Sequence, residues 1–237
     1  MFPVNAYKTI LAAMIVAACS ASCALANETN LIETLRPSAK RAISEAGQIE
    51  PERVAALKKA AAYVSDRIAQ GKPAELTFIC THNSRRSHLS QIWAQTAAVY
   101  YDLPNVTTYS GGTEATACNP RTVRTLRRAG FSIAQSTDGS NPLYLAQISE
   151  TRPVTKMFSK KYSDASNPQK DFAAIFSCDQ ADGMCPVVEG AGLRMPILYV
   201  DPKKSDNTAA EDATYDERSR QIAREMFYLM SQVKMAK

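Results

Sequence analysis

Apolar and polar positions recur with two different periods along this chain, and the change of period predicts its elements. Between residues 27 and 71 the apolar positions recur every three or four residues, as in a helix; they are Val54, Leu57, Ala61, Val64 and Ile68. From residue 75 onward, short apolar runs alternate with helical patterns. The runs predict strands at 75–80, 106–110, 172–178 and 195–200, and the patterns predict helices at 84–101, 119–129 and 214–234.

This alternation predicts an α/β fold. We expect a single three-layer domain, residues 74–237, with a central and mostly parallel sheet. An N-terminal helical extension, residues 27–73, should pack on the sheet, and a partner-binding arm is the alternative. The insert at 131–170 is expected to be irregular or extended, with pieces 143–148 and 154–158 forming a hairpin over the site.

Residues 1–26 have the pattern of a secretory signal peptide. Lys8 precedes the apolar stretch 10–18, and Ala24-Leu-Ala26 forms a small-residue cleavage site. The apolar stretch is short for a membrane span. A rival pattern, Val16-Ala-Ala-Cys19, resembles a bacterial lipobox and would leave Cys19 as a lipid anchor. The prediction is an exported, periplasmic protein, with a membrane-anchored lipoprotein as the alternative.

The charge of the chain suits an anionic substrate. The formal net charge of the 237 residues is +5, and Lys8 is the only charge within the predicted signal. Such a diffuse basic excess does not indicate nucleic acid, whose binding proteins gather lysine and arginine on one face. The dense run of Arg121, Arg124, Arg127 and Arg128 is interpreted as a solvated helix face.

The most informative stretch is Cys80-Thr-His-Asn-Ser-Arg-Arg86-Ser87, which follows the apolar run 76–79. A loop between a strand and a helix directs unpaired backbone N–H groups into one concavity, where the helix dipole adds positive potential. Such a nest binds a tetrahedral anion and stabilises a thiolate at Cys80. Arg86 would hold two oxygens of the anion in its planar fork. A small buried hydrophobe at Cys80 is the alternative.

Four further residues of the loop are expected to bind substrate: His82, Asn83, Ser84 and Ser87. Ser87 should hydrogen-bond the thiolate, and the side-chain amide of Asn83 should hold the shape of the loop. His88, on the following helix, is interpreted as a solvated or capping residue.

The pattern Cys80-x-x-Asn83-x-x-Arg86-Ser87 resembles the loop of the low-molecular-weight protein tyrosine phosphatases and the thioredoxin-coupled arsenate reductases. The resemblance runs from about Glu75 to the C-terminus. Four more segments fit it in order: 109–115, 119–130, 176–186 and 199–202. Two positions depart from the family loop. His82 stands where the reductases usually carry glycine, and Arg85 where a small or sulfur-bearing residue is common.

Two later cysteines separate the branches of this superfamily. Cys178 and Cys185 form one pair, whereas a zinc site would need closer ligands and two pairs, so no metal is expected. A thiol relay fits better. The resemblance implies that Cys80 forms an adduct with arsenic, which Cys178 and then Cys185 resolve. No bound cofactor is expected, only an external, thioredoxin-like dithiol donor. Two structural disulfides are the alternative, and Cys118 is interpreted as a packing residue.

Asp201-Pro202 follows the apolar run 196–200 and would place a carboxylate beside the other strand ends. From the residues alone a turn is the simpler interpretation. The resemblance implies a general acid that protonates the leaving group.

Three functions therefore remain open. The first is a thiol-dependent arsenate reductase. The second is a phosphomonoester hydrolase that acts on a phosphorylated substrate and keeps Cys178 and Cys185 as a redox guard. A protein that only binds oxyanions is the third.

Overall fold

The structure is a computed structural model, and it describes residues 28–185 and 187–233. The predicted signal peptide and the lipid-anchor candidate Cys19 lie outside these residues. Within the described part, no helix is both long and apolar enough to cross a membrane. The elements follow in the order η1 (Glu33–Leu35), α2 (Arg36–Ser44), η2 (Ala46–Gln48), α3 (Pro51–Ala69), β1 (Ala74–Cys80), α4 (Arg86–Tyr100), β2 (Val106–Gly112), α5 (Pro120–Arg128), β3 (Ser132–Gln135), β4 (Tyr144–Gln147), β5 (Thr155–Met157), β6 (Phe172–Phe176), α6 (Asp179–Met184), β7 (Ala191–Pro196), η3 (Pro202–Ser205) and α7 (Glu211–Ser231).

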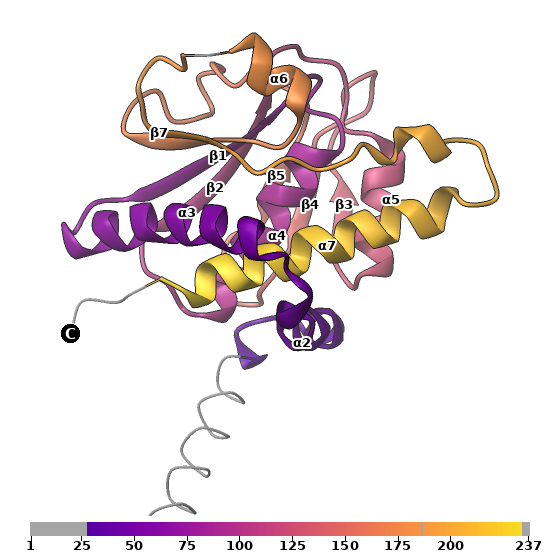
Figure 1. The fold of residues 1–237 in the computed structure, drawn as a ribbon. Helices are drawn as coiled ribbons and strands as arrows, with labels where there is room; N and C mark the ends of the chain where they lie inside the picture. Colours follow the sequence, from indigo (N-terminus) through magenta and orange to yellow (C-terminus); the bar gives the residue numbers. More distant parts are fainter. Residues whose placement is uncertain (1–27, 186, 234–237) are drawn as a thin grey trace, which may run out of the picture.

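The central sheet is parallel and has the strand order β2-β1-β6-β7 (Figure 1). In register, Phe78 of β1 lies between Ser110 of β2 and Ile175 of β6. Cys80 therefore pairs with Gly112 at the carboxyl end of the sheet, where ligands bind in open α/β folds. The predicted α/β fold with a parallel sheet and an N-terminal helical part is confirmed.

The two faces of the sheet bury separate apolar clusters, because successive side chains of a strand point to opposite faces. Ala173 and Ile175 of β6 belong to the main core, which α3, α4 and α7 cover. Phe172, Ala174 and Phe176 belong to a second cluster with α6. Cys80 lies in this second cluster, so the end of β1 faces α6.

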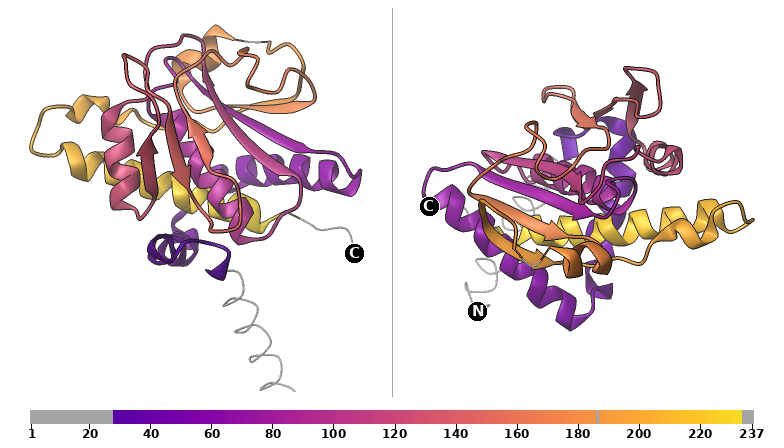
Figure 2. Two further views of the ribbon diagram at one scale, coloured as in Figure 1. Left: turned by 180° about the vertical axis from the view of Figure 1, so that it is seen from behind. Right: turned by 90° about the horizontal axis from the view of Figure 1, so that it is seen from above.

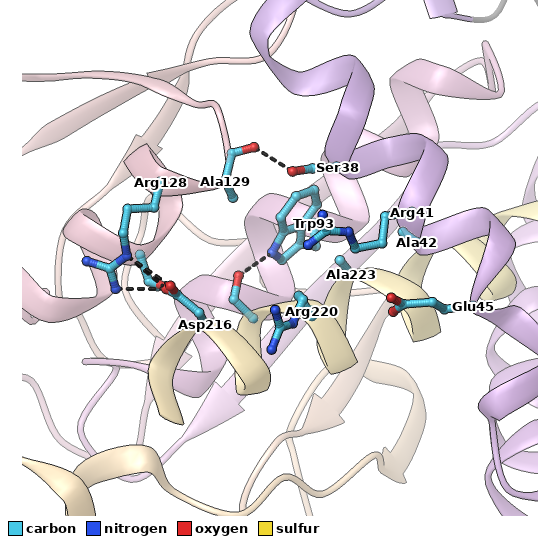
Figure 3. A pocket seen from close by; sticks show the side chains of 12 residues that line it. Ser38, Arg41, Ala42, Glu45, Trp93, Arg128, Ala129, Asp216, Arg220 and Ala223 are labelled. Carbon is cyan, nitrogen blue, oxygen red and sulfur yellow. Dashed lines mark hydrogen bonds and ion pairs between the residues drawn. The ribbon is translucent and has the colours of Figure 1, made fainter. Parts of the chain in front are cut away.

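The N-terminal extension packs onto the domain as predicted, against helices as well as against β1. Both α2 and α3 contact α7, and α3 also contacts β1. The hydroxyl of Ser38 in α2 donates to the backbone oxygen of Ala129 at 2.7 Å. Figure 3 shows the shallow pocket at this seam, where Trp93 donates from Nε1 to the hydroxyl of Ser219 in α7.

The insert between α5 and β6 forms a second sheet. Its order is β3-β4-β5 and its pairs are antiparallel, with Tyr144 of β4 opposite Met157 of β5. The hairpin predicted from pieces 143–148 and 154–158 is present as β4 and β5. Residues 159–160, just after it, contact the Cys80 loop. Figure 2 shows the small sheet from behind, beside the central one.

Several predicted boundaries shift. The strand expected at 195–200 is β7, which ends at Pro196. Ile197 and Tyr199 still donate their backbone N–H groups to Phe176 and Ser177, but these acceptors lie at and beyond the end of β6, where no strand continues. Helix α4 begins at Arg86 because residues 81–85 form the loop. Helix α7 begins at Glu211, three residues earlier than expected.

The arginine run of α5 faces solvent as predicted, with Arg124, Arg127 and Arg128 exposed. Three of the four arginines also form ion pairs with α7, which the sequence of α5 cannot show because the carboxylates come from a distant part of the chain. The pairs are Arg121 and Arg124 with Glu211 and Arg128 with Asp216, at 2.7–2.8 Å.

Candidate active site

The Cys80 loop connects the end of β1 to the start of α4, and Cys80 is 4% exposed. Asn83 is the loop residue whose φ angle is positive, at 45°, and the φ angle of His82 is not positive. Asparagine tolerates this left-handed conformation better than most residues. The loop therefore needs no glycine at position 82, because its unusual backbone angle falls one residue later.

The side chain of Asn83 holds the loop on both sides. Its Nδ2 donates to the Ser87 hydroxyl at 2.9 Å, and its Oδ1 accepts from the backbone N–H of Lys160 at 2.9 Å. The Ser87 oxygen lies 3.1 Å from the sulfur of Cys80. Because that oxygen already accepts from Asn83, the Ser87 proton is free to donate to Cys80. A chain of hydrogen bonds thus runs from the insert to the thiol.

Strand β2 ends in Gly111 and Gly112 because neither position has room for a side chain. A Cβ at Gly112 would lie 2.2 Å from the backbone oxygen of Glu114 and 2.8 Å from the backbone nitrogen of Asn83. A Cβ at Gly111 would lie 2.4 Å from the Cα of Tyr162. The Cys80 loop and the insert therefore pack directly on the glycine backbone, which side chains would hold apart.

The other predicted loop residues lie in different surroundings. The imidazole of His82 is half exposed, and its Nε2 lies 3.6 Å from Glu114. Ser84 is buried, and its backbone oxygen accepts from the N–H of Asn119 at the start of α5. Arg85 donates to the hydroxyl of Tyr215 in α7 at 2.8 Å. Arg85 therefore anchors the loop to α7, and the imidazole of His82 stays at the rim.

Arg86 and Asp201 are in contact where the loop ends and α4 begins. Arg86 Nη2 lies 2.9 Å from Asp201 Oδ2, and Arg86 Nη1 donates to the backbone oxygen of Tyr199 at 3.1 Å. The other carboxylate oxygen of Asp201 accepts from the N–H of Lys203, so Asp201 also caps η3. The structure thus brings the predicted anion-binding guanidinium and the predicted general acid into contact, while the turn that the sequence alone suggested is also present.

The three predicted relay cysteines share one apolar cluster. Cys80 and Cys178 are buried members of it, and the partly buried Cys185 packs against it. The hydroxyl of Thr81, the residue after Cys80, lies 3.4 Å from the sulfur of Cys178. Cys178 is the N-cap of α6, and its sulfur accepts from the N–H of Ala181 at 3.4 Å. All four cysteines of the described part are free thiols, and Cys118 lies in the main core instead.

Arg194 of β7 fastens the segment that carries the two later cysteines. Its Nη2 lies 2.6 Å from Asp182 Oδ1, and its Nε donates to the backbone oxygen of Cys185 at 2.9 Å. Its guanidinium also stacks over the ring of Phe176 at 4.4 Å from the centroid. Tyr162 packs against the same apolar cluster as Cys185. Nothing in the sequence points to Thr81, Arg194 or Tyr162, because their roles depend on tertiary neighbours.

Two buried basic residues lie behind the loop. His88 is fully buried, and its Nδ1 lies 3.1 Å from the hydroxyl of Ser110. Burial, and after it the charge of Lys160, lower the pKa of His88 to about 3. The expectation of a solvated or capping histidine is therefore wrong, because α4 turns this residue toward β2. Burial likewise lowers the pKa of Lys160 to about 8 and raises that of Cys118 to about 12.

Among residues 28–185 and 187–233, no group of three or more histidine, cysteine or acidic side chains is arranged to hold a metal ion. The fold and the site define an α/β protein with a buried thiol in the loop between β1 and α4, an arginine at the end of that loop paired with a carboxylate, and two further thiols in the same apolar cluster as the first.

Comparisons with known proteins agree with this description. An arsenate reductase from Bacillus licheniformis is 29% identical over 146 residues, 60% of this chain and 84% of that protein. An arsenate reductase from Halalkalibacterium halodurans is 26% identical over 134 residues, 56% and 78% respectively. No protein-family model matches the chain. These relatives confirm the resemblance to the arsenate reductases, and they confirm the prediction of an enzyme.

Two solved structures are also similar to the chain. A low molecular weight protein tyrosine phosphatase from Bacillus subtilis is 14% identical, covers 67% of this chain and 95% of its own, and has a TM-score of 0.45. An arsenate reductase in the phosphate binding state is 12% identical, covers 68% and 99%, and has a TM-score of 0.41.

Proposed function

We propose that this protein is a thiol-dependent arsenate reductase that uses Cys80 as nucleophile and Cys178 and Cys185 as resolving thiols. The observation that carries the proposal is the placement of all three sulfurs in one cluster, with Thr81 touching Cys178. The curated relatives named arsenate reductase support the substrate. A hydrolase of this site would use Cys80, Arg86 and Asp201 and would have no need of the other two thiols.

In the first step, the Cys80 thiolate attacks arsenic(V) of bound arsenate. The nest of loop N–H groups and the Arg86 fork hold the oxygens, because both present donors to a tetrahedral anion. A sulfur–arsenic bond forms, and an arsenic–oxygen bond breaks. Asp201 supplies the proton with which the oxygen leaves as water, which is general acid catalysis. Ser87 stabilises the thiolate before attack by donating its proton.

In the relay, the Cys178 thiolate attacks the sulfur of Cys80. A Cys80–Cys178 disulfide forms, the sulfur–arsenic bond breaks, and its electron pair stays with arsenic, which leaves as arsenite. Cys185 then attacks Cys178 and releases the Cys80 thiolate, leaving a Cys178–Cys185 disulfide. An external, thioredoxin-like dithiol reduces this disulfide and is itself oxidised. Arsenic thus gains two electrons, and the external dithiol supplies them.

Cys178→Ser tests the relay against hydrolysis. With arsenate and an excess of dithiol, the variant should lose multiple turnover, because no thiol remains to break the sulfur–arsenic bond. Its hydrolysis of p-nitrophenyl phosphate should stay within about twofold of wild type, since the Cys80 loop is intact. Cys118→Ser is the control and should keep both activities. Sustained arsenate turnover by Cys178→Ser would reject the relay.

A phosphomonoester hydrolase remains the second candidate, because the contact of Arg86 with Asp201 assembles the groups it needs. Under this alternative, wild type would hydrolyse aryl phosphates at useful rates and would reduce no arsenate with any dithiol donor. A protein that only binds oxyanions would show neither activity, while phosphate or arsenate would still raise its melting temperature.

We further propose export to the periplasm on the strength of residues 1–26, with lipidation at Cys19 as the alternative. The reductant would then be a thioredoxin-like dithiol of that compartment. Fractionation of cells that express the full chain, with Cys19→Ser as the control, tests both.

A further inference from the structure

A cavity of about 450 Å³ lies apart from the Cys80 loop, between α4, β2 and β5. Its size is typical of small-molecule sites. Most of its wall is apolar, with Val99, Leu103, Ile148 and Phe158 among the lining residues. None of residues 80–86 lines it, so the cavity is separate from the candidate active site.

Gln91 fixes one side of the cavity wall. Gln91 is 4% exposed and lines the cavity, and its side-chain oxygen Oε1 is buried without a hydrogen bond. The side-chain nitrogen donates to the backbone oxygens of Thr108, at 3.2 Å, and Lys156, at 3.4 Å. Rotating the amide would turn its oxygen toward these two carbonyl oxygens, so the orientation is fixed. Oε1 itself has almost no accessible surface, so Gln91 fixes the wall through its two donated hydrogen bonds and offers a ligand no acceptor.

A buried cation lines the same cavity. Lys160 is 5% exposed, and within the described residues its ammonium makes neither an ion pair nor a hydrogen bond. The ammonium lies over the ring of Phe158, 4.4 Å from the centroid. Asp164 favours its charge only from beyond ion-pair distance, while His88 stays neutral. Because a buried cation is stable only when paired, an anionic group is the missing partner.

The open edge of β2 does not offer a place for an added peptide strand. Its outward backbone groups at Thr108 already bond to Gln91 and Gln95, and the oxygen of Ser110 accepts from Asn167. Strand addition needs such groups to be free. The cavity therefore suits a small molecule better than a polypeptide.

We propose that this cavity binds a small, mainly apolar carboxylate. The carboxylate pairs with the ammonium of Lys160, and the apolar body fills the space along Ile148 and Leu103. Val154, which is exposed at the rim, borders the entrance.

The experiment measures binding of two matched probes to the full chain by titration calorimetry. Indole-3-acetate carries the carboxylate, and its methyl ester lacks the charge. We expect the ester to bind at least tenfold more weakly than indole-3-acetate. Phosphate at saturating concentration should leave this binding unchanged, because the site shares no residue with the Cys80 loop.

Two variants locate the site. Lys160→Met should bind the acid and the ester equally, and Val154→Trp should weaken the acid at least tenfold by obstructing the entrance. Gly47→Ala, which lies in η2 with open space around its Cα, should bind as wild type does. Any of four results would overturn the proposal. These are equal binding of the acid and the ester by the wild type, no binding of either probe, displacement of the acid by phosphate, and binding of the acid by Val154→Trp as tightly as by the wild type. The last test stands even if Lys160→Met does not fold.

Discussion

Arg86 and Asp201 form an ion pair, with 2.9 Å between guanidinium nitrogen and carboxylate oxygen, across the mouth of the Cys80 loop. The guanidinium that should grip an incoming oxyanion is thus occupied by the carboxylate that should protonate its leaving group. An anion must separate the two before it can use both donors of Arg86.

Asp201→Asn should therefore separate binding from catalysis. Removing the competing charge should lower the inhibition constant of phosphate about fivefold, because Arg86 is released. The same change removes the acid, so turnover of p-nitrophenyl phosphate should fall by about 10²–10³. Asparagine can still accept from the N–H of Lys203, which keeps the cap of η3. Steady-state inhibition kinetics measure both effects, and an unchanged phosphate constant would show that the ion pair does not oppose anion binding.

Asn83 combines a left-handed backbone with two side-chain hydrogen bonds, and substitutions can separate the two contributions. Asn83→Ala should lower the free energy of unfolding by about 3 kcal/mol, through loss of both bonds and added strain. Asn83→Gly loses the bonds but accepts a φ of 45°, so it should be about 1 kcal/mol more stable than Asn83→Ala. Urea unfolding of the two variants gives the difference. If they prove equally stable, the backbone angle contributes no strain.

Gly112 touches the backbone of the Cys80 loop, where a side chain has no room. Gly112→Ala should destabilise the protein by about 3 kcal/mol, at the upper end for overpacking, and should remove activity. Gly47→Ala adds the same methyl group where no atom lies within 4 Å and should change stability little. Thermal unfolding of the two variants compares the effect of the same added methyl group in two surroundings. A mild effect at Gly112 would mean that the loop can shift.

Arg194 holds the Cys178–Cys185 segment to β7 by three hydrogen bonds, to the backbone oxygen and the carboxylate of Asp182 and to the backbone oxygen of Cys185. Arg194→Met should let the segment open more often and speed alkylation of Cys178, about tenfold for each 1.4 kcal/mol of local stability lost. Mass spectrometry after timed exposure to iodoacetamide resolves the individual cysteines. Arg152→Met, which breaks an exposed pair with Asp102, is the control and should leave the rate unchanged. Equal rates in both variants would show that Arg194 does not restrain the segment.

Lys160 should make stability depend on pH in the alkaline range. Its pKa of about 8 in the folded protein lies below the ordinary 10.5, so the unfolded chain binds more protons between these values. Stability from this group therefore rises with pH across that window, by an amount on the order of 3 kcal/mol. Lys160→Met should lack the rise. Unfolding in denaturant at pH 7.5 and 10.5 measures it, and parallel curves for the two proteins would contradict the burial of a charged lysine.

Much of the fold follows from short-range pattern. The apolar run at 76–79 and the repeats in α3, α4 and α7 are local signals, and the structure places them where the periods predict. The Cys80 loop is equally local, since its spacing is contained within eight residues. Strand β3 and the ion pairs of α5 escaped prediction, because each depends on a partner distant in sequence. The same is true of His88, whose burial follows from the approach of β2.

The candidate site divides in the same way. Cys80, Asn83, Arg86 and Ser87 lie within one local motif, and the sequence is sufficient to place them together. Asp201 came from resemblance, and the structure puts it beside Arg86 even though β7 ends five residues earlier. Nothing in the sequence indicates a role for Lys160, because that role depends on the cavity that surrounds the residue in the fold.

The sulfur of Cys178 does two tasks, since it is both a proposed nucleophile and the atom that caps the first turn of α6. Once that sulfur is bonded to another sulfur, its lone pairs are less basic and its direction is set by the new bond. The N–H of Ala181 then loses its acceptor, and the turn loses an anchor. Formation of a disulfide at Cys178 would therefore loosen the first turn of α6, the helix that this residue caps, without a separate hinge.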